Sequence, residues 1–301
     1  MRRGWATSTN SSAQWKIGLP SRATMSARMR RTAGRSVASK LFAILNAFAP
    51  GESRLTLSEI SRRTGLPLPT AHRLMGELVR FGGLEREDGR TYRIGVRLWE
   101  LGSLAPIRGG LRELAMPYME DLYEATHENI QLAVLADLEA MVIEKISGRA
   151  SIRIVTRVGG RLPLHATGVG KILLAHAPPD VIERVLAAGL KRYATRTIVD
   201  PELLRANLEL VRTRGYSVTC DEMTVPAMSV GAPIVGPEGQ VAAALSVVVD
   251  SRSGDPDRLA VAVRTAARGL SRQVIDSWER IEPLVPPLVL GSQTPEERGD
   301  E

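Results

Sequence analysis

Apolar residues between Thr56 and Gly83 recur every three or four positions, which is the period of a helix with one buried side. The stretch opens with the Thr-x-x-Glu spacing of a capping box, in which a hydroxyl and a carboxylate each satisfy an unpaired backbone N–H group. Gly65 stands where a helix ends in a left-handed residue, and Pro69 suits the first turn of a second helix. The pattern therefore predicts two helices joined by a tight turn. The buried stripe of the second helix is expected to comprise Ala71, Leu74, Met75, Leu78 and Val79.

The remaining side chains of this second helix form a polar, cationic face. They are Thr70, His72, Arg73, Glu77 and Arg80. Such a face opposite a buried stripe is typical of a helix that enters a DNA groove, although an amphipathic helix pair inside a core shows the same pattern. Residues 84–95 favour DNA binding because they read as two strands joined by an Asp-Gly turn, the wing of a winged helix-turn-helix. Arg86, Arg90 and Arg93 are expected at the tip of this wing, within reach of phosphates.

Helices are also predicted on both sides of this unit. Residues 35–49 read as a helix that Pro50 and Gly51 end. Its continuous apolar face comprises Val37, Leu41, Ile44, Leu45 and Phe48. A helix over residues 111–126 is expected to link two domains, with Pro117 either kinking it or starting its second part.

From His127 onward the apolar period changes to that of a sheet interrupted by helices. Strands are expected at residues 130–135, 140–146, 152–158, 216–222, 229–235 and 240–249. Helices are expected at residues 169–177, 180–188, 201–214 and 255–278. For the helix over 201–214, Asp200 is the expected N-cap and Gly215 the stop. Because hairpin-connected strands stand before and after a block of helices, the pattern predicts an α+β domain with an antiparallel sheet.

Charge is distributed unevenly along the chain. Residues 1–105 hold 18 Lys and Arg against 7 Asp and Glu, whereas the remainder holds 22 against 26. A basic N-terminal third on a mildly acidic body indicates a polyanion partner for one domain only. The single cysteine, Cys220, provides neither a disulfide framework nor a cysteine zinc site, which suits a reducing cytoplasm. No apolar run approaches the roughly 20 residues of a membrane span.

Candidate chemistry is sparse. Lys171 follows Gly168-Val169-Gly170, but a phosphate loop would also need a glycine at position 165 and Ser or Thr at position 172. The four histidines show no short metal-ligand spacing, and Cys220 has no base visible in the sequence. Asp221 and Glu222 are neighbours on a strand and are expected to face opposite sides. The sequence therefore predicts no catalytic site, metal site or cofactor.

The order of these elements and several segments resemble the IclR family of bacterial transcriptional regulators over residues 35–276. The segments are GLPLPTAHRL, YRIG, RVGGRLPLHATGVGKILLA, RGYSV and VAAALSVVV. The resemblance implies a winged helix-turn-helix at 35–102, a linker helix at 103–126 and a GAF-like effector-binding domain at 127–280. The basic leader, 1–34, and the tail, 281–301, are expected to be disordered. Two alternatives for the leader stay open: it is a transit peptide, or the true first residue is Met25 or Met29.

The family's small-molecule pocket lies between the sheet and the start of the helix that carries Lys171. Carried over by position, its lining comprises Gly168, Val169, Thr219, Ser229, Ser246 and Val248. The two N–H groups at the helix start suit a carboxylate. Where some members carry Asp, Cys and a second Ser, this chain has Thr219, Ser229 and Val248, so a less anionic and more apolar pocket is expected. The expected effector is a small organic acid, aromatic or branched. The segment MTVPAMSVGAP lacks a glycine usual near Pro226, so this loop is expected to differ.

The resemblance also implies a homodimer or tetramer that binds a palindromic double-stranded DNA operator. Arg73 is the expected base contact, because a guanidinium can bridge O6 and N7 of guanine. All candidate DNA contacts are Thr56, Ser58, Pro69, Thr70, His72, Arg73, Arg80, Arg86, Arg90 and Tyr92. The expected function is a ligand-responsive regulator. Two alternatives stay open: an enzyme that acts on a small acid in the C-terminal cavity, and a constitutive DNA-binding protein whose pocket is silent.

Overall fold

The computed structural model describes residues 36–48, 52–103, 110–148, 151–152, 154 and 156–281. Contacts divide the chain into two compact units, the first ending at Gly102 and the second beginning at Ser103. The expected basic leader, 1–34, and all but the first residue of the expected tail, 281–301, lie outside the described residues. Among the described helices, none is long and apolar enough to cross a membrane.

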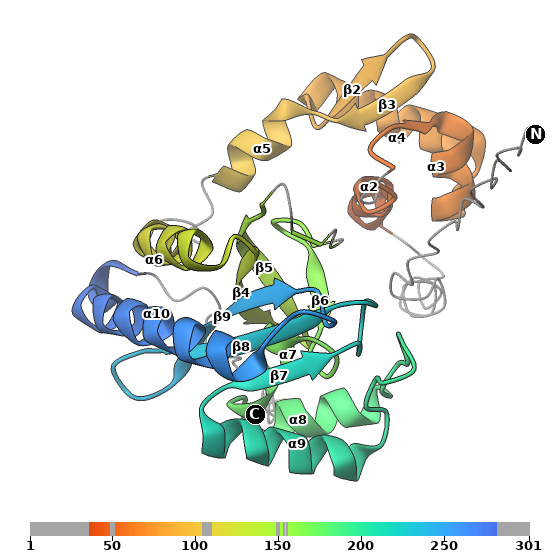
Figure 1. Cartoon of the computed structure of the whole chain (residues 1–301). Helices are drawn as coiled ribbons and strands as arrows, with labels where there is room; N and C mark the ends of the chain where they lie inside the picture. The colour runs from red at the N-terminus through yellow and green to blue at the C-terminus, as the bar shows by residue number, and fades with distance from the viewer. Residues whose placement is uncertain are drawn as a thin grey trace, which may run out of the picture. The chain divides into compact units, whose positions relative to one another are not determined.

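The N-terminal unit packs short helices against a small antiparallel sheet (Figure 1). Its helices are α2 (Val37–Leu45), α3 (Leu57–Thr64), α4 (Leu68–Phe81) and α5 (Val96–Ser103). Its strands are β1 (Leu55–Thr56), β2 (Leu84–Glu87) and β3 (Thr91–Ile94), in the order β1-β3-β2. The predicted helix-turn-helix and wing are therefore present. Strand β1 was not expected, because two residues are too short to show an apolar period.

Local signals of the sequence explain where these elements begin and end. Thr56 and Glu59 form the predicted capping box at the start of α3, and Gly65 ends that helix with φ 70°. The core of the unit includes the fully buried Ile60, Leu74 and Met75. Val79, expected in the buried stripe, is exposed instead.

Helix α2 differs from its prediction. It ends at Leu45 rather than near Ala49, and Val37 and Phe42 are exposed. Within the apolar face expected for this helix, Ile44 is fully buried, whereas Leu41 and Leu45 are only partly buried. The helix therefore has more apolar surface than its own unit covers.

The C-terminal unit is a six-stranded antiparallel sheet with helices on both faces (Figure 1). The strand order is β6-β5-β4-β9-β8-β7. The strands are β4 (Asn129–Ala136), β5 (Glu139–Ile146), β6 (Arg161–Pro163), β7 (Ser217–Cys220), β8 (Met228–Val235) and β9 (Val241–Val249). The helices are α6 (Leu111–Thr126), α7 (Gly168–Ala175), α8 (Pro179–Ala187), α9 (Pro201–Arg214) and α10 (Pro256–Asp276), followed by the 3₁₀ turn η2 (Trp278–Arg280).

Alternate residues of the strands separate two cores. Helices α6 and α10 pack on one face, against apolar side chains such as Val230, Leu245 and Val247. Helix α7 packs on the other face, and α8 and α9 form a further layer outside it. The α+β class, with an N-terminal winged helix-turn-helix and an antiparallel sheet, is confirmed.

One predicted strand of this unit is wrong. The described parts of 152–158 form no strand, and the sheet edge is β6, three residues after Val158. Side chains hold this segment in place of a ladder: Asn129 Nδ2 donates to the Ile152 carbonyl at 2.9 Å, and Lys145 Nζ donates to the Thr156 carbonyl at 2.9 Å. Pro117 lies within the single helix α6.

Candidate DNA interface and effector site

Helix α4 carries half of the residues expected to contact DNA, among them His72 and Arg73. Ala71, Leu74 and Met75 are buried, which turns His72 and Arg73 toward solvent. Thr70 is partly exposed. Among the described residues, no carboxylate lies within ion-pair distance of Arg73, so its guanidinium is available to a partner. This helix thus presents a cation near its N-terminal end, where helices of this motif meet base edges.

The turn that places α4 is held by side chains of α3. Thr64 Oγ1 donates to the Ile60 carbonyl at 2.7 Å, and Ser61 Oγ donates to the Leu66 carbonyl at 2.7 Å. Leu66 is buried between the two helices, and Gly65 supplies the left-handed conformation before it. The angle between α3 and α4 is therefore fixed by hydrogen bonds and packing together.

The wing forms a tight hairpin whose tip is Asp88, Gly89 and Arg90. Asp88 and Gly89 have φ 49° and 68°, the left-handed conformations that a turn of this kind requires. Arg90 is exposed there, without a described carboxylate within ion-pair distance. Arg86 is also exposed, and its Nε donates to the Gly89 carbonyl at 2.9 Å. This bond stiffens the tip.

Several residues that were predicted to contact DNA stabilise the N-terminal unit instead. Arg93 is not at the tip; it lies in β3 opposite Glu85 and pairs with that carboxylate at 2.7 Å. The ring of Tyr92 is 7% exposed and belongs to the core, so Tyr92 supports the wing and is removed from the contact set. The Thr56 hydroxyl is engaged in the capping box, which leaves it unavailable for DNA.

The remaining candidates keep surface positions. Ser58 and Pro69 are exposed. Arg80 is exposed but forms an ion pair with Glu77 one turn earlier, which reduces the charge it offers to a phosphate.

The carboxylate of Glu85 joins the wing to the helix that follows it. A hydrogen bond from the Val96 backbone N–H group, followed by the Arg93 guanidinium, lowers the pKa of Glu85. This carboxylate therefore stays ionised and ties β2 to the start of α5.

Four of the six residues expected to bind an effector lie on one face of the C-terminal sheet, and the other two lie at the start of α7. Ser229 pairs with Thr219 on one side and Val248 on the other, and Ser246 pairs with Gly231. Cross-strand partners share a face of a sheet. All six predicted residues, Gly168, Val169, Thr219, Ser229, Ser246 and Val248, are buried.

The start of α7 is pressed against this face. A Cβ atom on Gly168 would lie 2.4 Å from Ser229 Oγ, and one on Gly231 would lie 3.1 Å from the Gly168 carbonyl oxygen. Ser217 Oγ donates to that carbonyl at 2.8 Å. Thr167 caps the helix by accepting a hydrogen bond from the Gly170 N–H group at 3.1 Å. Glycine is therefore needed at two facing positions, so that the N-terminal turn can reach the hydroxyl-bearing strands.

This face of the sheet carries buried polar side chains that the packing of α7 does not explain. The Ser246 side chain is 1% exposed, and its hydroxyl has no hydrogen-bond partner among the described residues. A buried hydroxyl without a partner destabilises a folded chain, so its presence indicates another role. Asn129 and Gln131, opposite Val248 and Ser246 in β4, are buried as well. Neither residue was predicted from the sequence, although polar residues at alternate positions of an apolar strand are a visible signal.

A buried ion pair stands beside this face. Lys171 Nζ lies 2.7 Å from Glu222 Oε1, the lysine side chain is fully buried, and Glu222 Oε2 has no described partner. Burial lowers the pKa of Lys171 and raises the pKa of Glu222, while each charge opposes the shift of the other. The Gly-Val-Gly-Lys segment thus provides a buried cation, a role that was not predicted from the sequence.

His165, close to this pair, is a structural residue. Its Nε2 lies 2.9 Å from the Lys191 carbonyl oxygen. Burial lowers the pKa of His165, and the charge of Lys171 acts in the same direction. Within the described part of the chain, no group of three His, Cys, Asp or Glu side chains is placed to hold a metal ion.

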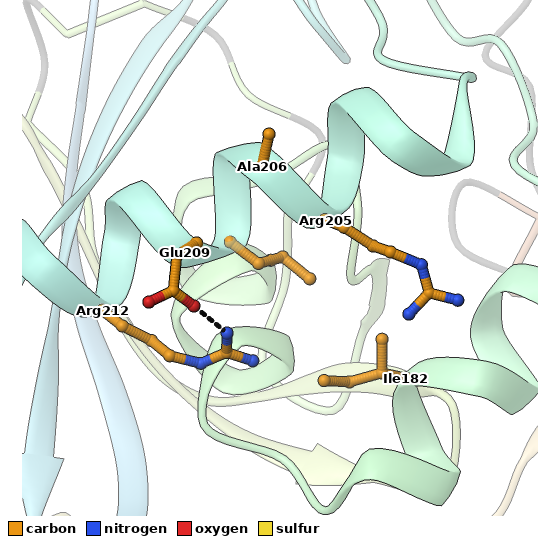
Figure 2. Close-up of a pocket in the computed structure, with 6 residues that line it drawn as sticks. Ile182, Arg205, Ala206, Glu209 and Arg212 are labelled. Atoms are coloured by element: carbon orange, nitrogen blue, oxygen red, sulfur yellow. Dashed lines mark hydrogen bonds and ion pairs between the residues drawn. The ribbon is translucent and has the colours of Figure 1, made fainter.

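A surface groove with a volume of about 400 Å³ lies between α8 and α9 (Figure 2). Its cationic groups are already occupied: Arg205 pairs with Glu183 at 2.6 Å, and Arg212 pairs with Glu209 at 2.6 Å. None of the expected effector residues lines it. The six residues expected to bind an effector lie elsewhere, on the sheet face beneath α7 and at the start of that helix.

Comparisons with known proteins agree on one family. The model described as IclR helix-turn-helix domain matches residues 37–88, and the model described as bacterial transcriptional regulator IclR C-terminal matches residues 107–272. The HTH-type transcriptional regulator KipR of Bacillus subtilis is 34% identical over 239 residues, 78% of this chain and 95% of that protein. The glycerol operon regulatory protein of Streptomyces coelicolor is 33% identical, covering 77% and 93%. A crystal structure of an IclR homolog complexed with 4-hydroxybenzoate, from Microbacterium hydrocarbonoxydans, is 37% identical, with a TM-score of 0.73 and coverage of 79% and 99%.

Proposed function

This chain belongs to the IclR family of bacterial transcriptional regulators and is therefore a DNA-binding regulator, and from that premise we propose a more specific function. We propose that it binds a palindromic operator in the cytoplasm as a homo-oligomer. Its proposed effector is a small aromatic acid. The observation that carries the DNA-binding part is the outward face of α4, where Arg73 is exposed without a described ion-pair partner. In this proposal Arg73 contacts a guanine, with His72 and Thr70 beside it. Ser58, Pro69, Arg80, Arg86 and Arg90 contact the backbone or nearby bases.

The test of Arg73 compares two DNA duplexes. An operator is first selected from random duplexes with the full chain. Arg73→Ala is expected to lower affinity for that operator by about 1–3 kcal/mol, with a much smaller loss on a random duplex. Arg214→Ala, which removes an exposed arginine from α9, is the matched control and leaves both affinities unchanged. An equal loss on both duplexes would make Arg73 a backbone contact.

The wing is tested through the salt dependence of binding. A phosphate contact releases condensed counterions, so its loss lowers the slope of log affinity against log salt by about 0.9. We expect Arg90→Ala to reduce the slope in this way on the operator and on a random duplex alike. A slope equal to that of the wild type would remove Arg90 from the contact set.

An apolar groove in the N-terminal unit supports the oligomeric part of the proposal. The groove has a volume of about 510 Å³. It is lined by Ala38, Leu41, Phe42, Leu45, Glu77, Leu78, Phe81, Leu98 and Leu101. Phe42 is 63% exposed, which is costly for a large apolar side chain unless another surface covers it. We assign the cover to a second copy of this chain, because a palindromic operator needs two recognition helices related by two-fold symmetry.

Sedimentation tests this assignment. Phe42→Asp is expected to shift the protein toward the monomer and to weaken operator binding, because a charge cannot be buried in an apolar interface. Leu203→Asp, at an exposed leucine of α9, is the control. Wild-type sedimentation of Phe42→Asp would exclude this groove as the interface.

The effector is proposed to bind on the sheet face beneath α7. The N–H groups at the start of α7, with the hydroxyls of Thr219, Ser229 and Ser246, suit a carboxylate, and Val169 and Val248 suit a ring. The 37% identical homolog whose structure contains 4-hydroxybenzoate supports an aromatic acid. The likeness of this domain to GAF modules enters here as a further proposal. Ligand binding then changes operator affinity by linkage, through different affinities for two arrangements of the domains or subunits.

Binding of 4-hydroxybenzoate, benzoate and propionate, measured by calorimetry, tests this part. We expect the aromatic acids to bind and to change operator affinity. Ser246→Ala is expected to weaken their binding by about 0.5–1.5 kcal/mol, while the ligand-free protein melts no lower, because an unsatisfied buried hydroxyl is lost. Thr265→Ala, at an exposed hydroxyl of α10, is the control. Conversion of the acid to a product would indicate an enzyme, and binding without any change of operator affinity would indicate a constitutive DNA-binding protein.

A further inference from the structure

The N-terminal end of α4 carries an apolar surface that the fold does not use. Pro67, Leu68 and Pro69 are all exposed, and the Leu68 side chain retains 47% of its accessible surface. Leu68 does not belong to the core of the N-terminal unit, which is built from neighbours such as Leu66 and Ala71. An exposed apolar segment of this kind contributes little to folding, so its position on the recognition helix calls for a different explanation.

The backbone on both sides of Leu68 is constrained. Pro67 has φ −56° and ψ 141° at the N-cap position, and Pro69 occupies the first turn of α4. A proline ring fixes its own φ, so the chain loses little further freedom when this turn binds a partner. Leu68 and His72 are four residues apart and therefore lie on the same side of the helix. The leucine thus adds an apolar side chain to the N-terminal turn of the proposed DNA-contact face.

The chemistry of leucine limits what it can recognise in a DNA groove. Its side chain has no hydrogen-bond donor or acceptor, so it cannot read the polar edges of guanine, adenine or cytosine. The major groove has one apolar base feature, the 5-methyl group of thymine. Resting on the proposed DNA-binding function, we propose that Leu68 is a specificity-determining residue that contacts the 5-methyl group of one thymine in each half-site of the operator.

The expected size of the contact follows from the area that one methyl group removes from water. Burying one CH₂-sized group contributes about 0.8 kcal/mol, which is about a fourfold change in affinity. Replacing the contacted thymine by deoxyuridine removes only this methyl group and keeps base pairing. It is therefore expected to weaken wild-type binding about fourfold at that position.

The experiment is a deoxyuridine scan of the operator selected with the full-length protein. Each thymine is replaced in turn, and affinity is measured for the wild type, Leu68→Ala and Leu203→Ala. Leu203 is an exposed leucine of α9, 64% accessible, and serves as the matched control. We expect the wild type and Leu203→Ala to lose affinity at the same thymine, whereas Leu68→Ala becomes insensitive there and keeps the wild-type response at every other thymine.

A second variant gives a gain of preference. Leu68→Asn is expected to shift the selected base at this position from thymine toward adenine, since an asparagine amide can pair with N6 and N7 of adenine. A deoxyuridine profile of Leu68→Ala identical to that of the wild type, or no methyl-sensitive position in the wild type, overturns the role of Leu68 alone. Failure of the wild type to select any duplex overturns the proposed DNA-binding function itself.

Discussion

The buried ion pair of the C-terminal unit yields a stability prediction with a definite size. Lys171 Nζ and Glu222 Oε1 are 2.7 Å apart, and the side chains are 0% and 9% exposed. Replacing Lys171 by methionine keeps the length of the side chain but leaves a carboxylate in the interior without its cation. We expect Lys171→Met to lower the free energy of unfolding of this unit by about 3–5 kcal/mol near neutral pH.

The pH dependence separates this mechanism from simple loss of packing. Burial raises the pKa of Glu222, and Lys171 opposes that rise. An acid with a raised folded-state pKa favours folding when protonated and opposes it as pH rises through that pKa. The deficit of Lys171→Met should therefore shrink as pH falls. In Glu222→Gln the lone Lys171, whose pKa burial lowers, should give the opposite trend, with a deficit that grows as pH falls.

Hydrogen exchange in urea measures both effects on the full chain. The amides of β4 and β9 lie in the middle of the sheet and are expected to exchange only when the whole unit opens. The double variant with methionine at both positions is the control, because replacing a buried pair by apolar residues is often neutral or stabilising. Single variants within about 1 kcal/mol of the wild type, or a double variant no more stable than the singles, would refute this account of the pair.

Glycines provide the other predictions. Gly76→Ala should stabilise α4 by about 0.5–1 kcal/mol in a denaturation experiment, since no atom lies within 4 Å of the added Cβ. The same change should weaken operator binding in a DNA titration, because the methyl group lies on the Arg73 face. Gly95→Ala should destabilise the wing by about 1–3 kcal/mol, because its Cβ would lie 2.0 Å from a backbone oxygen, and an unchanged melting temperature would contradict this. Gly168→Ala should keep operator binding but lose the effector response, which calorimetry and a DNA titration with ligand can check.

Local signals made much of the fold predictable. The helix over 201–214 was expected between Asp200 and Gly215, and α9 has those bounds, because an N-cap carboxylate and a left-handed glycine both act within one turn. The capping box of Thr56 and the Asp-Gly turn of the wing are equally local. Features that depend on few neighbours in sequence were therefore the ones that the sequence could indicate.

The errors concern contacts between distant residues. The pair of Lys171 and Glu222 joins positions 51 residues apart, and no spacing rule brings them together. Tyr92 looked available for DNA, but the fold packs its ring into the core beside Leu84 and Leu74. The positions of Ser229 and Ser246 came from the family resemblance and not from periodicity, since apolar residues dominate both strands.

The separation of the C-terminal sheet into two unlike faces has a consequence for how such a regulator diversifies. The face under α6 and α10 is apolar and close-packed, and it supplies cohesion. The face under α7 also has an apolar core, which includes Val142, Val169 and Ile172, but its strands add the small buried hydroxyls of Thr219, Ser229 and Ser246. In the proposed effector site, exchanging one of these hydroxyl-bearing residues for another small residue changes the groups offered to a ligand, whereas the apolar residues of both cores stay the same. Under the proposed function, single exchanges at these hydroxyl positions give duplicated copies of the gene a route to new effectors.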